Sequence, residues 1–456
     1  MKHVSGFADV GMPPRVPGLP LLGSTLALRR QGMLPFLLSS HRAMGDVFRM
    51  RVGHKENYVI AYPDGAAHVL QQNAKNYAKS ESYRRMEVML GNGLLITEGE
   101  LWRRQRSVAQ PFFTRSWVDG QAGTMSSVVD ARLRRWQRTL VEGKAIDIKS
   151  ECRLLSLELV SHCVFGMDAA EDAVALGRAT DALSHYVERQ RLRLLPLPKS
   201  VPTPRNLSAR YHRWCVDRAV RRFTAAPHAG EGKGLIATLL GAKNDRGEPI
   251  FDDQQVKDQI VTILVAGYET TAAAMAWTIF LLAKHPDVAD RLRTEVDRVM
   301  GDRMPTVEEL GRVSYLTMVL NESMRLYPPA WVVGRRAIAA DSLRGYTIPA
   351  GASVGVHLFV IHRHPDYWSR PDVFDPEHFA PEAAAARPRL AFVPFGAGAR
   401  TCIGHYLAML ELRLALAMFV QRFSVSVPSD YEPEPQPNVT LTPPDGMPLK
   451  LRSRHA

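Results

Sequence analysis

The residues with the clearest capacity for chemistry lie in a short glycine-rich loop, 395–404, which reads FGAGARTCIG. Its glycines let the backbone turn tightly and approach a flat cofactor closely. Backbone N–H groups in such a loop can stabilise negative charge on the sulfur of Cys402, and a helix that begins near Gly404 would also favour the ionised thiol. Arg400 is placed to pair with a carboxylate on a cofactor. The loop therefore predicts a thiolate ligand.

The loop alone leaves three further roles open for Cys402. A lone cysteine is most often a buried structural residue. A catalytic nucleophile needs a partner base, and none is obvious in the sequence. A zinc site is disfavoured, because no second Cys or His stands at ligand spacing.

A second candidate pair, Glu269 and Thr270, interrupts the long apolar stretch 260–283. An acid inside an apolar helix needs a reason, because an unpaired buried charge is costly. A purely structural reason is a threonine that bonds back to the preceding turn and a glutamate that reaches the surface. The length of the stretch would also suit a membrane span, but an acid at mid-membrane is expensive and rare. We therefore expect a buried helix in a globular core.

Two further pairs have helical spacing. Glu322 and Arg325 lie three residues apart, which places both on one helical face. On their own they would indicate an ordinary surface ion pair. Trp102 and Arg106 lie one turn apart in the segment WRRQR, where a solvated basic face is the alternative.

The elements that position these residues are mainly α-helices, with a smaller β part. Alternating runs predict strands at 47–52 and 58–61, and helical patterns then dominate up to Tyr327. The long apolar helix follows Asp252 and ends before Pro286. Strands, turns and prolines follow from Trp331, and a last helix spans about 404–423. A hairpin is expected around 445–446. We expect a single domain over 1–456.

Composition limits the class of protein without choosing a partner. The chain has 456 residues and a net charge of +12, which favours anionic partners. The arginines are scattered and no nucleic-acid-binding motif accompanies them, so we expect no nucleic acid partner. Four cysteines without a C-x-x-C pair indicate reduced thiols, and the N-terminus lacks a signal-peptide pattern. We therefore expect a cytoplasmic protein without a membrane anchor.

The loop resembles the cysteine-ligand loop of the cytochrome P-450 family. That pattern is met at Phe395, Gly398, Arg400, Cys402 and Gly404. The other segments agree in order and spacing: the family's Trp-x-x-x-Arg helix, its long helix with an acid beside a threonine, and its Glu-x-x-Arg pair. One departure is His378, in the segment PEHF, where the family usually has Arg. Because imidazole offers fewer donors than guanidinium, this network is expected to be weaker or pH-sensitive.

The resemblance implies the cytochrome P-450 fold, with the long central helix over a haem b (iron protoporphyrin IX) and Cys402 as the ligand of its iron. It implies that Glu269 and Thr270 supply protons for oxygen activation, and that Gly267 lets the helix loosen near the haem. Glu322, Arg325 and His378 would hold the region around the cysteine loop. The expected partners of the haem propionates are Trp102, Arg106, Arg336 and Arg400.

The resemblance also implies a monooxygenase that takes O2, a hydrophobic small molecule such as a terpenoid, fatty acid, steroid or polyketide-like compound, and electrons from a separate protein. An acidic ferredoxin or flavodoxin is expected, because Arg103, Arg104, Arg400 and Arg413 would form a basic surface. No fused reductase domain is expected. Position alone predicts a substrate pocket, with core packing as the alternative, lined by Leu94, Leu95, Val265, Ala266, Ala330, Trp331 and Val332. The competing function is a haem-thiolate sensor without turnover.

Overall fold

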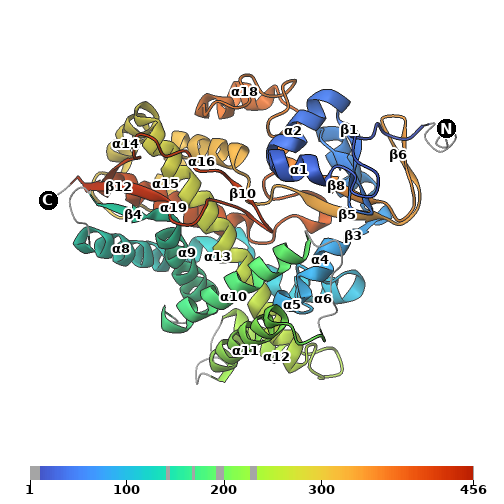
Figure 1. Cartoon of the computed structure of the whole chain (residues 1–456). Coiled ribbons are helices and arrows are strands. Elements are labelled where there is room, and N and C mark those ends of the chain that lie inside the picture. Colours follow the sequence, from blue (N-terminus) through green and yellow to red (C-terminus); the bar gives the residue numbers. More distant parts are fainter. Residues whose placement is uncertain (1–10, 140–143, 167–169, 192–199, 226–233, 455–456) are drawn as a thin grey trace, which may run out of the picture. The chain divides into compact units, whose positions relative to one another are not determined.

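The structure is a computed structural model that describes residues 11–139, 144–166, 170–191, 200–225 and 234–454 (Figure 1). The chain forms two units, each assembled from segments that are distant in sequence. The first unit comprises Met1–Arg84, Ala330–Val373 and Glu382–Cys402. The second unit comprises Arg85–Pro329, Phe374–Pro381 and Ile403–Ala456.

The first unit is built on a five-stranded sheet in the order β1-β2-β8-β5-β3. β2 and β8 pair in parallel, and the other neighbours pair antiparallel. Side chains alternate along β8, so Val354 and Val356 point into a core that also contains Ile60 and Ala397. The strands are β1 (Val47–Val52), β2 (Lys55–Ile60), β3 (Tyr77–Lys79), β5 (Val333–Ala337) and β8 (Ser353–Val356). The sequence correctly placed β1, and β2 begins three residues earlier than expected.

Short helices and one hairpin complete the first unit. The hairpin consists of β6 (Asp341–Leu343) and β7 (Tyr346–Ile348). The helices are α1 (Thr25–Gln31), α2 (Met33–Met44), α3 (Pro63–Ala67), η1 (His68–Gln72), η2 (Ala74–Asn76), α4 (Glu81–Arg85), α17 (Leu358–Ile361), α18 (Pro381–Ala385), η5 (Arg389–Ala391) and η6 (Gly398–Arg400), of which α4 and α18 lie at the unit's boundaries.

The second unit is organised around α13 (Asp253–Lys284), a long helix that contacts α9, α11, α16 and α19 (Figure 1). Asp252 and Gln255 form a capping box at its start, and Pro286 follows its end. The helix is long and apolar enough to cross a membrane, but most of it is buried inside the protein. The expected buried core helix is therefore what the structure contains.

The remaining elements of the second unit are mostly helical. The helices are α5 (Glu87–Leu90), α6 (Gly99–Ala109), η3 (Gln110–Phe113), α7 (Arg115–Gly120), α8 (Ala122–Thr139), α9 (Ile148–Phe165), α10 (Ala170–Arg191), α11 (Pro204–Ala225), α12 (Leu235–Gly241), α14 (Pro286–Met300), α15 (Val307–Arg312), α16 (Ser314–Leu326), η4 (Pro376–Phe379) and α19 (His405–Arg422). The strands are β4 (Ala145–Asp147), β9 (Phe423–Ser426), β10 (Gln436–Pro437), β11 (Leu441–Thr442) and β12 (Pro448–Ser453).

The predicted hairpin around 445–446 is wrong. A turn does form there, and Gly446 has a positive φ of 69°. However, β11 pairs with β10, whereas β12 pairs with β4 and β9. The local turn pattern could not reveal that β12 finds its partners elsewhere in the chain.

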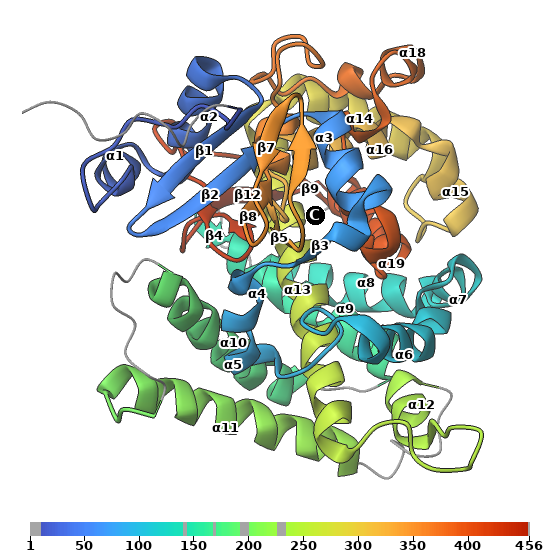
Figure 2. The same ribbon diagram turned by 90° about the vertical axis from the view of Figure 1, so that its right-hand side faces the viewer.

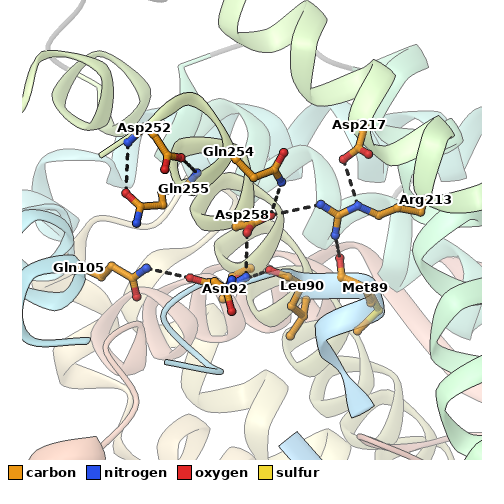
Figure 3. A network of polar contacts seen from close by, with 11 residues as sticks. Met89, Leu90, Asn92, Gln105, Arg213, Asp217, Asp252, Gln254, Gln255 and Asp258 are labelled. Atoms are coloured by element: carbon orange, nitrogen blue, oxygen red, sulfur yellow. Dashed lines mark hydrogen bonds and ion pairs between the residues drawn. The ribbon is translucent and has the colours of Figure 1, made fainter. Parts of the chain in front are cut away.

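A network of polar contacts fastens the segment after α5 to α13 (Figure 3). The carboxylate of Asp258 accepts the backbone N–H of Asn92 at 2.7 Å and the side-chain amide of Gln254 at 2.8 Å. Arg213 of α11 donates to Asp258 at 3.1 Å and to the carbonyl oxygen of Met89 at 3.1 Å. One buried carboxylate therefore joins α11, α13 and the segment after α5.

Two glycines make this close approach possible. A Cβ on Gly91, whose φ is +55°, would lie 2.0 Å from Oδ1 of Asp258. A Cβ on Gly93 would lie 1.9 Å from Oγ1 of Thr262. No larger residue fits at either position without moving the segment away from α13. The segment thus holds Leu94, a predicted pocket residue, at a fixed place beside this helix.

Candidate active site

The loop that carries Cys402 is anchored through its backbone while the cysteine itself is exposed. The backbone N–H of Cys402 donates to the carbonyl oxygen of Phe395 at 2.9 Å, and that of Thr401 donates to Gly398 at 3.0 Å. Gly398 has a φ of +74°, and a Cβ there would lie 2.1 Å from the carbonyl oxygen of Leu70. The loop is consequently held tightly against its own unit, and Cys402 lies at its exposed side.

The four cysteines, which all lie among the described residues, form no disulfide. Cys152 and Cys163 are buried, and burial raises the pKa of both thiols. Such thiols stay protonated and chemically inert at neutral pH. Cys402 has the opposite surroundings, since it is exposed and stands three residues before α19, close to the positive end of this helix.

Two arginines of the first unit are placed differently from one another. Arg336 on β5 is exposed, and Arg400 in η6 is partly buried. The neighbouring Arg335 is buried, and its guanidinium donates to the carbonyl oxygen of Gly334 at 3.0 Å. Of the two adjacent arginines, Arg336 is therefore the one available to an external carboxylate.

The long helix α13 is partly exposed around Glu269 and Thr270, the two residues predicted to supply protons. Val265 and Tyr268 are buried, whereas Ala266 is exposed and Glu269 and Thr270 are half-buried. Oγ1 of Thr270 donates to the carbonyl oxygen of Ala266 at 2.7 Å, which is the back-bonding that a threonine inside a helix commonly adopts. The hydroxyl oxygen keeps its capacity to accept a hydrogen bond.

Gly267 does not have the expected role in this structure. The helix continues through it without interruption. A Cβ at this position would lie 2.9 Å from Cγ2 of Val160 on α9. The glycine therefore permits close packing of α13 against α9, and a loosened helix is not observed.

A polar cavity adjoins Glu269. Its lining includes ionisable residues from four segments: Lys149, Arg153, Asp181, His185, Glu269 and Asp445. Arg153 pairs with Asp181, and its guanidinium lies 5.9 Å from the ring centre of Tyr268. Burial, and then the nearby Asp181 carboxylate, raise the pKa of Glu269 to about 7, while Arg153 and Lys149 oppose the rise. This carboxyl group can gain and lose a proton near neutral pH.

The sequence did not indicate that Lys149, Arg153 and Asp181 lie around Glu269. Arg153 and Asp181 come from α9 and α10, far from Glu269 in sequence, and Lys149 pairs with Asp445 at 2.7 Å. Each is an ordinary charged residue on a helix or turn. Only the packing of α9 and α10 beside α13 brings them together.

Trp102 and Arg106 occupy one side of α6, as their spacing predicts. The Arg106 guanidinium lies 5.8 Å from the ring centre of Trp102, which is within the range of a cation–π contact. Both side chains are half-buried, whereas Arg103 and Arg104 are exposed. Arg103 and Arg104 therefore form the solvated basic face that the sequence offered as the alternative.

The candidate pocket residues divide into packed and open positions. In the second unit, Leu94 and Val265 are buried, while Leu95 and Ala266 are exposed. In the first unit, Trp331 is buried against the ring of His357, and Ala330 and Val332 are partly exposed. Core packing thus accounts for Trp331 within its unit, and the open positions are the ones that a ligand can reach.

Glu322 and Arg325 form a fully buried ion pair on α16. Nε and Nη2 of Arg325 each donate to one oxygen of the carboxylate at 2.7 Å. Oε1 of Glu322 also accepts the backbone N–H of Asp375 at 2.9 Å and Nδ1–H of His378 at 3.0 Å. His378 therefore lies where a third partner was expected, and it contributes one donor. The pair fastens η4 to α16.

One group among the described residues has the composition of a metal site: His41, Asp46 and His364 in the first unit. The hydrogen bonds in this group indicate which ring nitrogen of His364 carries the proton. The backbone N–H of Asp366 donates to Nδ1 of His364 at 3.2 Å, so the proton of a neutral ring lies on Nε2, which contacts Asp46 at 2.9 Å. His41 and Arg344 also contact Asp46. Although burial opposes it, these donors hold the pKa of Asp46 well below its usual range.

Arg413 does not belong to a basic surface, contrary to expectation. Its Nη2 donates to the carbonyl oxygen of Leu310, and burial lowers the pKa of its guanidinium. α19 packs against α15 here, which encloses the side chain. Arg103 and Arg104 remain exposed candidates, and Arg104 also pairs with Glu100 at 3.0 Å.

The residues present fit a haem. The first unit offers an exposed cysteine on an anchored loop, together with two arginines that suit propionates. In the second unit, the apolar helix α13 is open at Ala266, next to an acid and a hydroxyl group. A soft sulfur donor, cations for carboxylates and an uncovered apolar surface match the parts of this cofactor.

The comparisons with known proteins agree with this fit. The cytochrome P450DA heme domain superposes on the chain with a TM-score of 0.84 and 25% sequence identity, over 97% of both chains. The fold is therefore that of a P450 heme domain. The family model described as Cytochrome P450 matches residues 13–451.

Two Streptomyces relatives are similar over most of their length. The cyclooctat-9-en-7-ol 5-monooxygenase of Streptomyces melanosporofaciens is 32% identical over 432 residues, which cover 93% of this chain and 90% of the relative. The pentalenene oxygenase of Streptomyces avermitilis is 29% identical over 442 residues, which cover 96% of each. The chain belongs to the cytochrome P450 family. It is a haem-dependent monooxygenase that uses O2, a hydrophobic substrate and a redox partner, and the predicted fold class, family and enzyme class are confirmed.

The buried ion pair yields a prediction about stability. Arg325→Leu leaves the Glu322 carboxylate buried without its main partner and should lower the free energy of unfolding by about 3–5 kcal/mol. His378→Ala removes one of four contacts and should cost about 1–2 kcal/mol. Glu322→Leu combined with Arg325→Leu should be less destabilising than Arg325→Leu alone, because no charge remains buried. Urea unfolding measures all three variants, and a double variant destabilised at least as much as Arg325→Leu alone would contradict the account.

Glu269 yields a prediction about pH. Because its pKa in the folded protein, about 7, lies above that of the unfolded chain, stability is lost as pH rises from about 4.5 to 7. Glu269→Gln removes this pH-dependent loss of stability. Relative to the parent, the variant should gain about 1 kcal/mol between pH 5 and 8, a value discounted for the partial exposure of the side chain.

The control for this measurement is Glu382→Gln, which changes an exposed acid on α18. Urea unfolding at several pH values should show no pH-dependent difference between this variant and the parent. A Glu269→Gln variant whose stability difference stays constant from pH 5 to 8 would show that the carboxyl group does not titrate in this range.

Proposed function

We propose that this monooxygenase inserts one oxygen atom from O2 into a terpenoid-like small molecule. The observation that carries the proposal is the exposed Cys402, presented by a loop whose backbone is anchored on both sides of Gly398. The substrate class is supported by the relatives, whose names describe oxidation of cyclooctat-9-en-7-ol and of pentalenene. Hydroxylation of a carbon–hydrogen bond is the reaction that these names favour.

The proposed cofactor is haem b, held by Cys402 as the ligand of its iron. When bound, the haem supplies the activation of O2, and electron density from a thiolate ligand favours cleavage of the O–O bond. Phe395, Gly398 and Gly404 give the loop its shape. Arg400, Arg336, Trp102 and Arg106 would bind the propionates through charge-assisted hydrogen bonds. Glu322, Arg325 and His378 have a structural role.

Glu269 and Thr270 are proposed to manage protons. The Thr270 hydroxyl can accept a hydrogen bond while it donates to Ala266, and rotation of its O–H away from Ala266 would let it donate that proton. Glu269 has a pKa of about 7 and faces the polar cavity, so it can exchange protons with water there. Arg153 and Asp181, which also line the cavity, form an ion pair beside Glu269. The alcohol and the acid thus have separate tasks.

The proposed substrate contacts are apolar. The open positions Leu95 and Ala266 would touch the substrate, and the packed positions Leu94 and Val265 would support them. Ala330, Trp331 and Val332 are proposed to contribute from the first unit. An apolar lining of this kind excludes water and favours a hydrocarbon skeleton.

Electrons are proposed to come from a separate acidic ferredoxin or flavodoxin. Arg103 and Arg104 are exposed on α6, and steering by such charges raises the association rate at low salt. We further propose that the chain works as one haem-binding domain in the cytoplasm.

One experiment tests both turnover and the electron donor. The haem-loaded protein is incubated with NADPH, a surrogate ferredoxin and its reductase, and a panel of terpenoids under ¹⁸O₂. We expect a product that carries one ¹⁸O atom. Arg103→Glu with Arg104→Glu should slow reduction at low salt by roughly tenfold or more and weaken its dependence on salt.

The matched control reverses the same number of charges on α8, with Arg134→Glu and Arg135→Glu, and should leave reduction unchanged. Equal reduction rates in the α6 variant and the parent at low salt would overturn the proposed docking surface. A protein that binds haem and is reduced, but forms no oxidised product from any member of the panel, would point to the sensor function instead.

A further inference from the structure

The outer face of α11 carries a stripe of large apolar side chains. Leu207, Tyr211 and Trp214 are spaced by four and three residues, so they share one side of the helix. Their exposed fractions are 50%, 60% and 48%. The rings of Tyr211 and Trp214 stack with their centres 6.2 Å apart. Single exposed apolar residues are ordinary, but a contiguous group marks a binding surface.

Arginines surround this stripe. Arg210, Arg218, Arg221 and Arg222 are exposed on the same side of the helix. The Arg218 guanidinium lies 5.4 Å from the ring centre of Trp214. Between Pro204 and Arg222 the sequence contains one acid, Asp217, and this residue pairs with Arg213 at 3.0 Å. The face therefore combines aromatic rings with an excess of positive charge.

The opposite face of α11 makes the contacts that hold the helix in the second unit. Ala209, Val216, Ala219 and Val220 are buried there, and Arg213 reaches Asp258. Figure 2 shows α11 at the edge of the second unit, with α10 and α13 on one side of it. Packing within the unit thus accounts for the inner face, whereas the side chains of the outer face are exposed among the residues that the structure describes.

We propose that the outer face of α11 docks onto the surface of an anionic lipid bilayer. In this position the arginines would contact lipid phosphates, and the rings of Tyr211 and Trp214 would lie at the level of the headgroups. Basic residues near such a surface are attracted to its anionic lipids. The net charge of +12 acts in the same direction over a longer range.

Two other occupants match the face less well. A second copy of the chain bound through the same face would bring one arginine stripe against the other, because an isologous contact pairs a patch with itself. An acidic protein would neutralise the arginines but would have to offer apolar partners along about 22 Å of straight helix. A bilayer offers both anionic groups and an apolar interior. If the proposed function is correct, the same bilayer is also where a terpenoid-like substrate accumulates.

The test uses the haem-loaded, full-length protein and unilamellar vesicles of phosphatidylcholine, with and without phosphatidylglycerol. Co-sedimentation should require phosphatidylglycerol and should disappear at high salt. Arg218→Gln with Arg221→Gln should weaken binding by roughly tenfold or more, and so should Tyr211→Ser with Trp214→Ser. The control variant, Arg134→Gln with Arg135→Gln, removes the same charge from α8 and should bind like the parent.

A second readout reports the depth of insertion. Brominated lipids should quench part of the tryptophan fluorescence, and Trp214→Phe should abolish that part. Binding that is equal with and without phosphatidylglycerol, or that survives both α11 double variants, would overturn the proposal. Binding to polyglutamate as strong as binding to vesicles, without quenching by brominated lipid, would also overturn it and assign the face to an acidic protein. Vesicle binding requires no turnover, so its failure is distinguishable from failure of the proposed oxidation.

Discussion

A thiolate ligand must be held firmly while its sulfur stays open to a partner, and this requirement governs the structure around Cys402. The loop meets it through the backbone, with the Cys402 N–H bonded to Phe395 and Gly398 pressed against Leu70. Buried surroundings would have kept the thiol protonated, as they do for Cys152 and Cys163. The sheet of the first unit, with Ala397 in its core, supplies the support for this loop.

The second unit places two acids in opposite surroundings, and their different tasks follow. Glu322 is fully buried and accepts from Arg325, Asp375 and His378, so its charge is matched by fixed donors. Glu269 is next to the Asp181 carboxylate and an open stretch of α13, and burial raises its pKa to about 7. The first arrangement suits a fixed structural joint, whereas the second suits proton exchange.

The fold and much of the candidate site could be predicted because they depend on local patterns. The ends of α13 follow from a capping residue and a proline, and the spacing of Glu322 and Arg325 requires only one helix. Contacts between segments that are distant in the chain leave no local pattern in the sequence. The pairing of β12 with β4, the enclosure of Arg413 and the group around Asp258 each depend on helices or strands that meet only in the folded chain. The packing role of Gly267 could not be predicted for the same reason, since Val160 lies on another helix.

The most direct test of the central claim is the absorption spectrum of the reduced, haem-loaded protein with carbon monoxide. Ligation by Cys402 predicts the long-wavelength Soret band of a haem-thiolate complex. Cys402→Ser should abolish this band, whereas Cys215→Ser, at a partly exposed cysteine on α11, should leave it unchanged. A long-wavelength band that survives in Cys402→Ser, or a parent protein that shows only the band of a nitrogen-ligated haem, would contradict the assignment.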